Sequence, residues 1–332
     1  MTQRAQTGTD RSGAILDPVL LSVAVIWGAN FPVYKSLMHY IAPTGLLAVR
    51  FVTMTSLLLV ILWVTGRLRH NPRSMWLPLF LAGVLVMGTQ QVSFVLGLNL
   101  TAAGEGSLLF STAPVFTTLM VAAAGIERIG RGNWVGALVA FVGVAMVIMG
   151  GSSAQNAPHT RVVGDLLMLV SSLGYALFMV ISKGLMERYG TLKALTVAYM
   201  FGALVVVPFG LPDVLAVDWG ALPLVFWLWL FYIVVVSGVY GFAAWYWRIS
   251  RTSPARVAVY QYIVPVVAMV TAAAWLGERP AAVQIAGALL VLAGLALARR
   301  RSRAAQVEAQ LRLCAIHSRA SFCASAICSA VM

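Results

Sequence analysis

The stretch PVFTTLMVAAAGIERIGRGNWVGALVAFVG at positions 114–143 decides the fold, because its landmarks return in PVVAMVTAAAWLGERPAAVQIAGALLVLAG at positions 265–294. Five residues recur as the same type 151 positions later: Pro114, Glu127, Arg128, Gly136 and Gly143 correspond to Pro265, Glu278, Arg279, Gly287 and Gly294. Upstream, four more recur 148 positions later: Asp17, Lys35, Leu37 and Met38 correspond to Asp165, Lys183, Leu185 and Met186. The chain therefore contains an internal duplication, and one loop insertion between the blocks accounts for the change in spacing.

Composition places this duplication in a membrane. The 332 residues are 61% hydrophobic and only 10% charged, with a mean hydropathy of +0.89. Soluble domains carry about 25% charged residues, so the composition excludes a fold surrounded by water. The net charge of +13 could suggest a nucleic-acid partner, but the basic residues lie in short clusters between apolar runs. Such clusters orient membrane helices, so we expect a lipid bilayer and no nucleic acid as partner.

Apolar runs long enough to cross roughly 30 Å of hydrocarbon begin near residue 16. The sequence contains ten of them, at 16–38, 43–65, 76–98, 101–124, 133–150, 164–186, 192–209, 222–247, 253–275 and 281–298. The first run is too long for a signal peptide and has no small-residue cleavage site, so we expect it to remain as a helix. The sequence thus predicts an all-α integral membrane protein with ten transmembrane helices.

The loops predict how these helices are oriented. If the N-terminus is inside, the arginine and lysine clusters at 67–73, 128–131, 188–193, 248–251 and 299–303 are all cytoplasmic. The outer loops then hold little beyond Arg161 and Arg279. This asymmetry predicts that both termini are cytoplasmic. Because five helices per copy is an odd number, the second copy must be inserted upside down, which gives two inverted five-helix repeats.

The predicted organisation has four segments. Residues 1–15 form a cytoplasmic N-terminal segment, 16–150 the first repeat, 164–299 the second repeat, and 300–332 a basic, disordered cytoplasmic tail. The tail is short of large apolar residues and has no amphipathic repeat, so we expect it to be loosely ordered. Its cysteines, Cys314, Cys323 and Cys328, have no metal-ligand spacing.

Several motifs are read as structural. Gly136 and Gly143 lie two helical turns apart, as do Gly287 and Gly294, and small residues on one face let helices approach closely. We therefore assign helices five and ten to a peripheral scaffold. Asp17 before Pro18 predicts the capped start of helix one, and Asp165 is expected to open helix six in the same way.

Charged residues near the predicted helix ends are also read as structural. Lys35 and Lys183 lie near helix C-termini, where a cation is favourable, although Lys35 could also attract an anionic substrate. Glu127 and Glu278 suit interfacial ion pairs, each being followed by an arginine.

Polar and aromatic residues inside the predicted spans are candidates for a substrate path. Trp27, Asn30 and Tyr34 share one face of helix one. An asparagine within the membrane must bond another helix, water or a substrate, and the flanking aromatic residues favour a cavity wall over a simple helix–helix bond. The further candidates are Gln90, Gln91, Tyr175, Tyr240, Tyr260, Gln261 and Tyr262. Adjacent residues point about 100° apart, so at most one of each adjacent pair can face the path fully.

Pro114 and Pro265 are expected near the centres of helices four and nine. A proline removes an amide donor and frees the carbonyl one turn earlier, so each could be a packed kink or a hinge. Their matched positions in inverted halves favour the hinge.

Arg50 and Glu105 are expected to form an ion pair. Arg50 is seven residues into helix two, about 10 Å deep at 1.5 Å per residue, and Glu105 lies about one turn into helix four. An unpaired arginine at this depth would cost several kcal/mol, so a partner is required. Glu105 is the expected partner, and the pair could form a gate on the outer side of the path. The alternatives are a static bridge, or an Arg50 that bonds backbone carbonyls.

Several strings resemble the EamA family of the drug/metabolite transporter superfamily. They are Trp27-Gly28-Ala29-Asn30-Phe31, Arg50-Phe51, Ser111-Thr112-Ala113-Pro114-Val115-Phe116, Glu127 before Gly136 and Gly143, and Pro265 before Gly277-Glu278, Gly287 and Gly294. The resemblance covers residues 16–299. It implies ten helices in inverted repeats, a central cavity and export of small metabolites or drugs. The second half departs from the first, with Tyr175-Ala176 in place of Trp27-Gly28 and Ala198 in place of Arg50, so the site should depend more on the first half.

The resemblance favours a secondary transporter of a bacterial inner membrane that exports amino acids, other small organic metabolites or toxic compounds by alternating access. We expect no enzymatic activity, no metal and no cofactor, because phosphate-cradling, zinc-binding and nucleophile motifs are missing from the sequence. The expected partners are a small-molecule substrate and the bilayer, with protons as a candidate coupling ion. The expected assembly is a monomer or a weak homo-oligomer.

Two other functions are weighed against this one. An importer or exchanger of anionic, phosphorylated solutes should place two or more cations in its cavity, whereas only Arg50 and, marginally, Lys35 and Lys183 qualify. A membrane sensor or scaffold without transport would need an output domain, and the segment after residue 304 is too short for one.

Overall fold

A computed structural model of the chain describes residues 17–67, 73–124, 131–150, 158–251, 257, 259–294 and 297. Within these ranges every regular element is a helix. Seven helical spans are long and apolar enough to cross a membrane: Pro18–Leu37, Pro43–Val64, Arg73–Leu100, Ala103–Ala123, His159–Tyr189, Thr191–Leu215 and Leu224–Arg251. Two shorter apolar helices are Ile263–Leu276 and Ala282–Gly294. Segment 1–15, Glu127, Arg128 and the tail 300–332 lie outside the described residues, so what was expected of them stays a prediction.

The helices follow the predicted runs closely. The first half consists of α1 (Pro18–Leu37), α2 (Pro43–Val64), η1 (Arg73–Met75), α3 (Trp76–Leu81), η2 (Ala82–Gly88), α4 (Thr89–Leu100), α5 (Ala103–Phe110), α6 (Ala113–Ala123) and α7 (Arg131–Gly150). The second half consists of α8 (Pro158–Tyr189), α9 (Thr191–Leu215), η3 (Trp219–Ala221), α10 (Leu224–Phe231), η4 (Tyr232–Phe242), α11 (Ala243–Arg251), η5 (Val259–Tyr262), α13 (Ile263–Leu276) and helix 282–294.

The start of α1 confirms the predicted cap at Asp17. Its carboxylate accepts hydrogen bonds from the backbone amides of Val19 and Leu20, at 3.0 and 3.4 Å, and Pro18 opens the helix. Amides at a helix N-terminus have no partner within the helix, so this carboxylate satisfies two of them. It also lies 3.0 Å from the guanidinium of Arg248 in α11, which ties the start of α1 to the second half.

The start of α8 differs from the prediction. The helix begins at Pro158, before the expected start at 164, so Arg161 lies in a helix and not in a loop. Asp165 is therefore inside the helix and cannot cap it. Its fully buried carboxylate accepts a hydrogen bond of 2.7 Å from Thr101 and lies 3.7 Å from Arg161. The Asp165 carboxylate was expected to accept hydrogen bonds from the first amides of the helix, but it contacts Thr101 and Arg161 instead.

Predicted helix four is interrupted just before Pro114, and predicted helix nine changes its helix type just before the matched Pro265. Helix four breaks at Ser111 and Thr112, between α5 and α6, and helix nine changes from a 3-10 turn to α13 after Tyr262. Pro114 lies in the first turn of α6 and Pro265 is the third residue of α13. Because proline has no amide to donate, the carbonyl one turn earlier needs another partner. Helix four is broken here rather than merely bent, whereas helix nine stays continuous.

Predicted helices three and eight contain π-helical segments at corresponding positions. η2 occupies the middle of span 73–100 and η4 the middle of span 224–251. Adding 151 to the bounds of η2, 82 and 88, gives 233 and 239, which lie within η4. Such segments widen a helix locally and are often found at functional sites.

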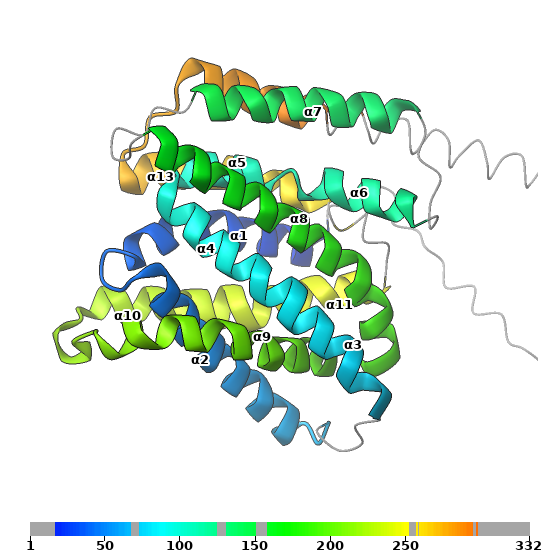
Figure 1. The fold of residues 1–332 in the computed structure, drawn as a ribbon, viewed down its shortest axis with the longest axis vertical. Coiled ribbons are helices and arrows are strands. Elements are labelled where there is room, and N and C mark those ends of the chain that lie inside the picture. Colours follow the sequence, from blue (N-terminus) through cyan, green and yellow to red (C-terminus); the bar gives the residue numbers. More distant parts are fainter. Residues whose placement is uncertain are drawn as a thin grey trace, which may run out of the picture.

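The largest helix contacts join the two halves. α2 packs on α9, α4 on α8, and α1 on α13, while α1 also contacts η4 and α11, and α8 contacts α5 and α6. Figure 1 shows these helices crossing in one bundle, with α7 and the orange helix 282–294 together at one edge. The core is therefore built from both halves and cannot be divided into two separate domains.

The contact between α7 and helix 282–294 confirms the packing role of Gly143 and Gly287. A Cβ atom on Gly143 would lie 2.6 Å from the carbonyl oxygen of Gly287. A Cβ on Gly287 would lie 2.7 Å from the carbonyl oxygen of Gly143. Both distances are far below van der Waals contact, so only glycine permits this approach of the two backbones.

Polarity is distributed as in a membrane protein. Large apolar side chains face outward, among them Trp63 at 70% exposure. Charged and amide side chains are buried within the bundle, among them Arg50, Gln91, Glu105 and Asp165. Buried polar groups of this kind mark the regions where a site is expected.

Candidate functional site

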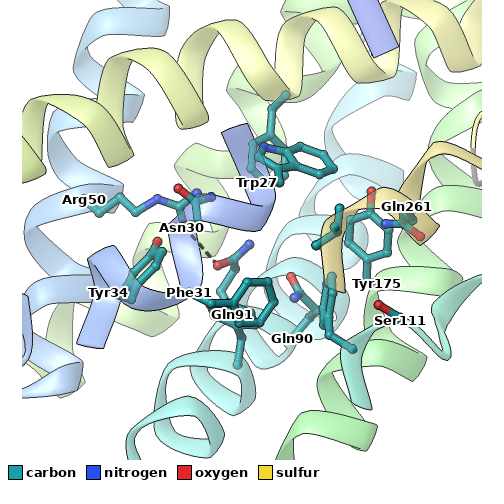
Figure 2. Close-up of a pocket in the computed structure, with 14 residues that line it drawn as sticks. Trp27, Asn30, Phe31, Tyr34, Arg50, Gln90, Gln91, Ser111, Tyr175 and Gln261 are labelled. Atoms are coloured by element: carbon teal, nitrogen blue, oxygen red, sulfur yellow. Dashed lines mark hydrogen bonds between the residues drawn. The ribbon is translucent and has the colours of Figure 1, made fainter. Parts of the chain in front are cut away.

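A cavity of about 60 Å³ lies between α1, α2, α4, α5, α8 and α13. Figure 2 shows polar and aromatic side chains from both halves converging on it. It brings together eight residues that the sequence analysis proposed: Trp27, Asn30, Tyr34, Arg50, Gln90, Gln91, Tyr175 and Gln261. The remaining lining residues are Phe31, Phe94, Phe110, Ser111, Phe242 and Val264, so most of the lining belongs to the first half.

Arg50 is the cationic residue of this lining and is only 3% exposed. Its Nη1 donates a hydrogen bond of 3.0 Å to Oε1 of Gln91. The guanidinium carbon lies 5.7 Å from the ring centroids of both Tyr34 and Phe242, within range of a cation–π interaction. Nε has no hydrogen-bond partner. The protein thus positions this cation firmly without satisfying all of its donors.

Asn30 and Trp27 are both tied to Ser237 in η4. Nδ2 of Asn30 donates to the Ser237 hydroxyl at 2.5 Å, and Nε1 of Trp27 donates to the Ser237 carbonyl at 3.2 Å. Of the two roles considered for Asn30, the structure shows both: a bond to another helix and a place in a cavity wall. Its amide is fixed by Ser237, whereas its Oδ1 has no partner.

The two glutamines of α4 point in different directions. Nε2 of Gln90 donates to the Ser171 hydroxyl of α8 at 3.0 Å, while Gln91 accepts from Arg50. Both line the cavity, Gln90 toward α8 and Gln91 toward α2. This divergence follows from the angle of about 100° between adjacent helical residues.

Five polar atoms of the lining have no hydrogen-bond partner although they are buried. They are Oδ1 of Asn30, the hydroxyls of Tyr34 and Tyr175, Nε of Arg50 and Oε1 of Gln261. The large majority of buried side-chain polar atoms in proteins are hydrogen-bonded. A group of unpaired donors and acceptors around one cavity is therefore what a polar ligand or bound water would satisfy.

Aromatic rings form the rest of the wall. Trp27 meets the ring of Tyr175 edge-on, with centroids 6.3 Å apart, and Phe110 lies 5.2 Å from the same ring. Phe31 and Phe94 also pack edge to face, at 5.6 Å. Rings in such arrangements are rigid and apolar, so this part of the cavity suits a hydrocarbon group.

Two tyrosines proposed for the path, Tyr240 and Tyr260, do not line this cavity. The hydroxyl of Tyr240 hydrogen-bonds Ser22 at 2.8 Å, and 44% of this tyrosine is exposed. The hydroxyl of Tyr260 accepts from the backbone amide of Asp17 at 2.8 Å, a structural bond. The side chain of Tyr262 lies outside the described residues.

The expected ion pair between Arg50 and Glu105 is wrong. Arg50 bonds Gln91, whereas an oxygen of Glu105 lies 3.6 Å from Nε of Arg161. The prediction compared depth alone and placed Arg161 in a loop. Because α8 starts earlier than expected, Arg161 is carried into the bundle beside Glu105.

Glu105 belongs to a second, larger and more polar cavity of about 550 Å³ at the end of the bundle. Lys35, Asn99, Thr101 and Glu278 also line it. Glu278 accepts hydrogen bonds from the amides of Ala103 and Gly104, at 2.7 and 2.9 Å. The glutamate expected to form an interfacial ion pair thus caps α5.

Several lining residues were not identified from the sequence. Phe31 and Ser111 stood in quoted strings but were read only as parts of a resemblance. Phe94 and Phe110 lie at apolar positions that look like ordinary core. Phe242 and Ser237 lie on η4, where a π-helical segment shifts the faces away from regular 3.6-residue spacing. No periodicity in the sequence would have placed them.

Residues 15–149 and 162–300 both match the model of the EamA-like transporter family. The chain belongs to this family and is a multi-pass membrane transporter, as the resemblance implied. The two matched segments correspond to the two halves of the duplication.

Named relatives extend over nearly the whole chain. It is 29% identical to the "Probable terminal-alkyne amino-acid exporter" of Streptantibioticus cattleyicolor, over 87% of this chain and 95% of that protein. It is 28% identical to the "Probable amino-acid metabolite efflux pump" of Salmonella typhimurium, over 83% of this chain and 91% of the other. A crystal structure with 18% identity shares the fold, with a TM-score of 0.62 over 86% of this chain and 96% of the other.

Proposed function

We propose that this protein exports small organic metabolites, with amino acids and related carboxylates as the substrate class, by alternating access. The observation that carries the proposal is the central cavity, which combines one buried arginine, several unpaired polar atoms and a wall of aromatic rings. The names of the two relatives point to the same substrate class and the same direction.

The cavity chemistry suits a zwitterion with an apolar side chain. The guanidinium of Arg50 is a natural partner for a carboxylate, and its free Nε is a donor for one. The unpaired oxygens of Asn30 and Gln261 are acceptors for an ammonium group. The rings around Trp27 and Tyr175 suit the side chain. In this conformation the volume of about 60 Å³ is small for such a solute, so substrate entry requires the walls to move apart.

The proposed architecture is ten transmembrane helices in two inverted five-helix repeats, 16–150 and 164–299. Support comes from three matched features: the π-helical segments η2 and η4, the changes in helix geometry just before Pro114 and Pro265, and the glycine contact between α7 and helix 282–294. The cross-half contacts also come in equivalent pairs, since α4 with α8 is matched by α1 with η4 and α11.

The proposed orientation has both termini in the cytoplasm of a bacterial inner membrane. It rests on the arginine and lysine clusters, which fall on one side when the spans are followed in order. In this orientation the cavity of Glu105 and Glu278 lies toward the outside.

The interrupted helices suggest how access alternates. α5 and α6 are joined by two residues that are not helical, so either half can tilt without breaking a continuous helix. Phe110 and Ser111, at this joint, line the central cavity. A tilt of α5 would therefore move the cavity wall directly.

The rival reading, exchange of phosphorylated solutes, has less support. Arg50 is the cation among the residues that line the central cavity. Lys35 donates to the carbonyl of Asn99 at 3.2 Å, and Lys183 lies 3.9 Å from Glu187. Both lysines are thus used elsewhere, and a single arginine suits one carboxylate better than a dianion.

Proteoliposomes test this proposal. Vesicles loaded with the twenty unlabelled proteinogenic amino acids are placed in a radiolabelled mixture of the same compounds, and accumulation of label by exchange is measured. We expect accumulation that Arg50→Ala abolishes. If no amino acid exchanges in vesicles that contain folded protein, the substrate class is wrong.

A further inference from the structure

Two buried carboxylates share one guanidinium, and one of the two, Glu105, lines the larger cavity. Nε of Arg161 lies 3.6 Å from Oε1 of Glu105 and 3.7 Å from Oδ2 of Asp165. The side chains of both acids are 0% exposed, and that of the arginine is 12% exposed. If both acids were ionised, this cluster would hold one uncompensated negative charge in a buried place, which is costly.

The two carboxylates are not equivalent. Asp165 accepts a hydrogen bond of 2.7 Å from the Thr101 hydroxyl, whereas neither oxygen of Glu105 has a hydrogen-bond partner. The amides of Ala103 and Gly104, which begin the same helix, are already taken by Glu278. Glu105 is thus a buried acid that faces a cavity and accepts no hydrogen bond, and it is the member of the pair best suited to carry a proton.

The larger cavity gives Glu105 a route to water. Its volume is about 550 Å³, and its lining includes the exposed residues His39, Gly277 and Arg279. A proton is favoured over a metal cation because the guanidinium of Arg161 already lies within 4 Å of both acids. A metal ion there would be repelled at short range, whereas a proton bound to one oxygen neutralises the excess charge.

The pair is also connected to the central cavity by two helices. Glu105 lies five residues before Phe110 on α5, about 7.5 Å along the helix, and Asp165 precedes Tyr175 on α8 by ten residues, about 15 Å. Phe110 and Tyr175 both line the central cavity. A change in charge at the pair therefore acts on the two helices that carry part of the substrate wall.

We propose that Glu105 and Asp165 bind the proton that couples export to the proton gradient, with Glu105 as the group that is protonated and deprotonated in each cycle. This rests on the proposed transport function, because a coupling site acts only in a transporter. The charged groups that surround Glu105 are Asp165 and Arg161 of α8, Glu278 and Arg279 after α13, and Lys35 and His39 at the end of α1.

The test compares two modes of transport by Glu105→Gln in the amino-acid proteoliposomes described above. Exchange of labelled for unlabelled amino acid needs no net proton movement, and we expect it to stay within about twofold of wild type. Accumulation driven by an imposed pH gradient should fall at least tenfold. Glu105→Asp, which keeps a carboxyl, should retain the response to the gradient, and so should Glu187→Gln, which removes an exposed carboxylate of α8.

Two results would overturn the proposal while leaving the transport function intact. One is a wild-type protein that exchanges amino acids but does not accumulate them when a pH gradient is imposed. The other is a Glu105→Gln protein that responds to the gradient as wild type does. If Glu105→Gln does not elute as a monodisperse protein, Asp165→Asn replaces it, with the same expected loss.

A second measurement needs no substrate. Purified protein in weakly buffered detergent is shifted between about pH 5.5 and 8.5, and released protons are counted with an indicator dye. Since a coupled pair titrates as a unit, Glu105→Gln should release about one proton fewer than wild type. The control variant Glu187→Gln should release the same number of protons as wild type. Equal release by wild type and Glu105→Gln overturns the proton site even if the substrate class is also wrong.

Discussion

The hydroxyl of Ser172 donates a hydrogen bond of 3.1 Å to the carbonyl of Phe110, the group that Pro114 leaves without a helical partner. The same hydroxyl lies 2.8 Å from that of Thr112 in the break between α5 and α6. α8 thus supplies the hydrogen bond that the interrupted helix cannot make for itself. The joint is held by a side chain that can release it, and this makes the break suitable as a hinge.

Replacing Pro114 by alanine restores an amide that can bond the Phe110 carbonyl in place of Ser172. We expect a straighter and stiffer helix and a turnover rate lower by about three- to tenfold, equivalent to roughly 1 kcal/mol in the barrier. The measurement is the initial rate of exchange in proteoliposomes. Pro208→Ala is the control, since Pro208 lies within α9, away from any break. Unchanged rates for Pro114→Ala would mean that this proline only packs.

Arg50→Ala should abolish exchange, because it removes the one cation of the central cavity lining. Arg50→Lys should retain partial activity with a raised KM, since lysine keeps the charge but loses the forked geometry. Gln91→Ala should raise KM less, because the arginine stays while its positioning bond of 3.0 Å is lost. Initial rates at varied amino-acid concentration separate these effects. Lys183→Ala, outside the cavity, should behave as wild type.

Gly143→Ala should lower the stability of the protein by about 1–3 kcal/mol, because the added methyl group meets the backbone of Gly287. Gly184→Ala is the matched control, since a Cβ there has nothing within 4 Å. Thermal unfolding in detergent, followed by the intrinsic fluorescence of the ten tryptophans, measures the difference. Equal melting temperatures for the two variants would contradict the close contact.

The inverted arrangement predicts opposite labelling of two single cysteines. Gly130→Cys should react with a membrane-impermeant maleimide only from the cytoplasmic side, and Ala281→Cys only from the outside. Both are made after Cys314, Cys323 and Cys328 are replaced by serine. Right-side-out vesicles expose the outer face of the membrane to the maleimide, and inverted vesicles expose the cytoplasmic face. Labelling of both positions from the same side would refute the ten-helix inverted topology.

Ending the chain after Arg303 should leave membrane insertion and exchange unchanged. The removed segment has no apolar face to bury, so little folding energy depends on it. Membrane abundance by immunoblot and exchange rate per protein are the measurements. A loss of exchange at normal abundance would assign the tail a function.

The sequence predicted the helices well because each bilayer span needs a long apolar run, which can be read directly. It also located the cap at Asp17, the glycine contact and many of the cavity residues, since these depend on local patterns. It did not predict the start of α8, because Arg161 looks like a loop residue and Asp165 like a helix cap. Their actual partners are Glu105 of α5 and Thr101 in the turn before α5, which the sequence does not indicate.

The partners of charged residues were harder to predict for the same reason. Arg50 and Glu105 were matched by depth, but a pair also depends on which faces of two helices meet. The π-helical segments add to the difficulty, since they change the angle at which later residues emerge. Phe242 and Ser237 entered the site in this way, without any signal in the sequence.

The glycine contact between α7 and helix 282–294 has a consequence for biosynthesis. The chain emerges from the ribosome in order, so Gly143 enters the membrane well before Gly287 has been made. The same delay separates α1 from α13, which pack together. Arg50, Gln91 and Glu105 must therefore wait in the bilayer, incompletely covered, until the second half arrives. A nascent chain of this design depends on the insertion machinery to shelter its polar residues during synthesis.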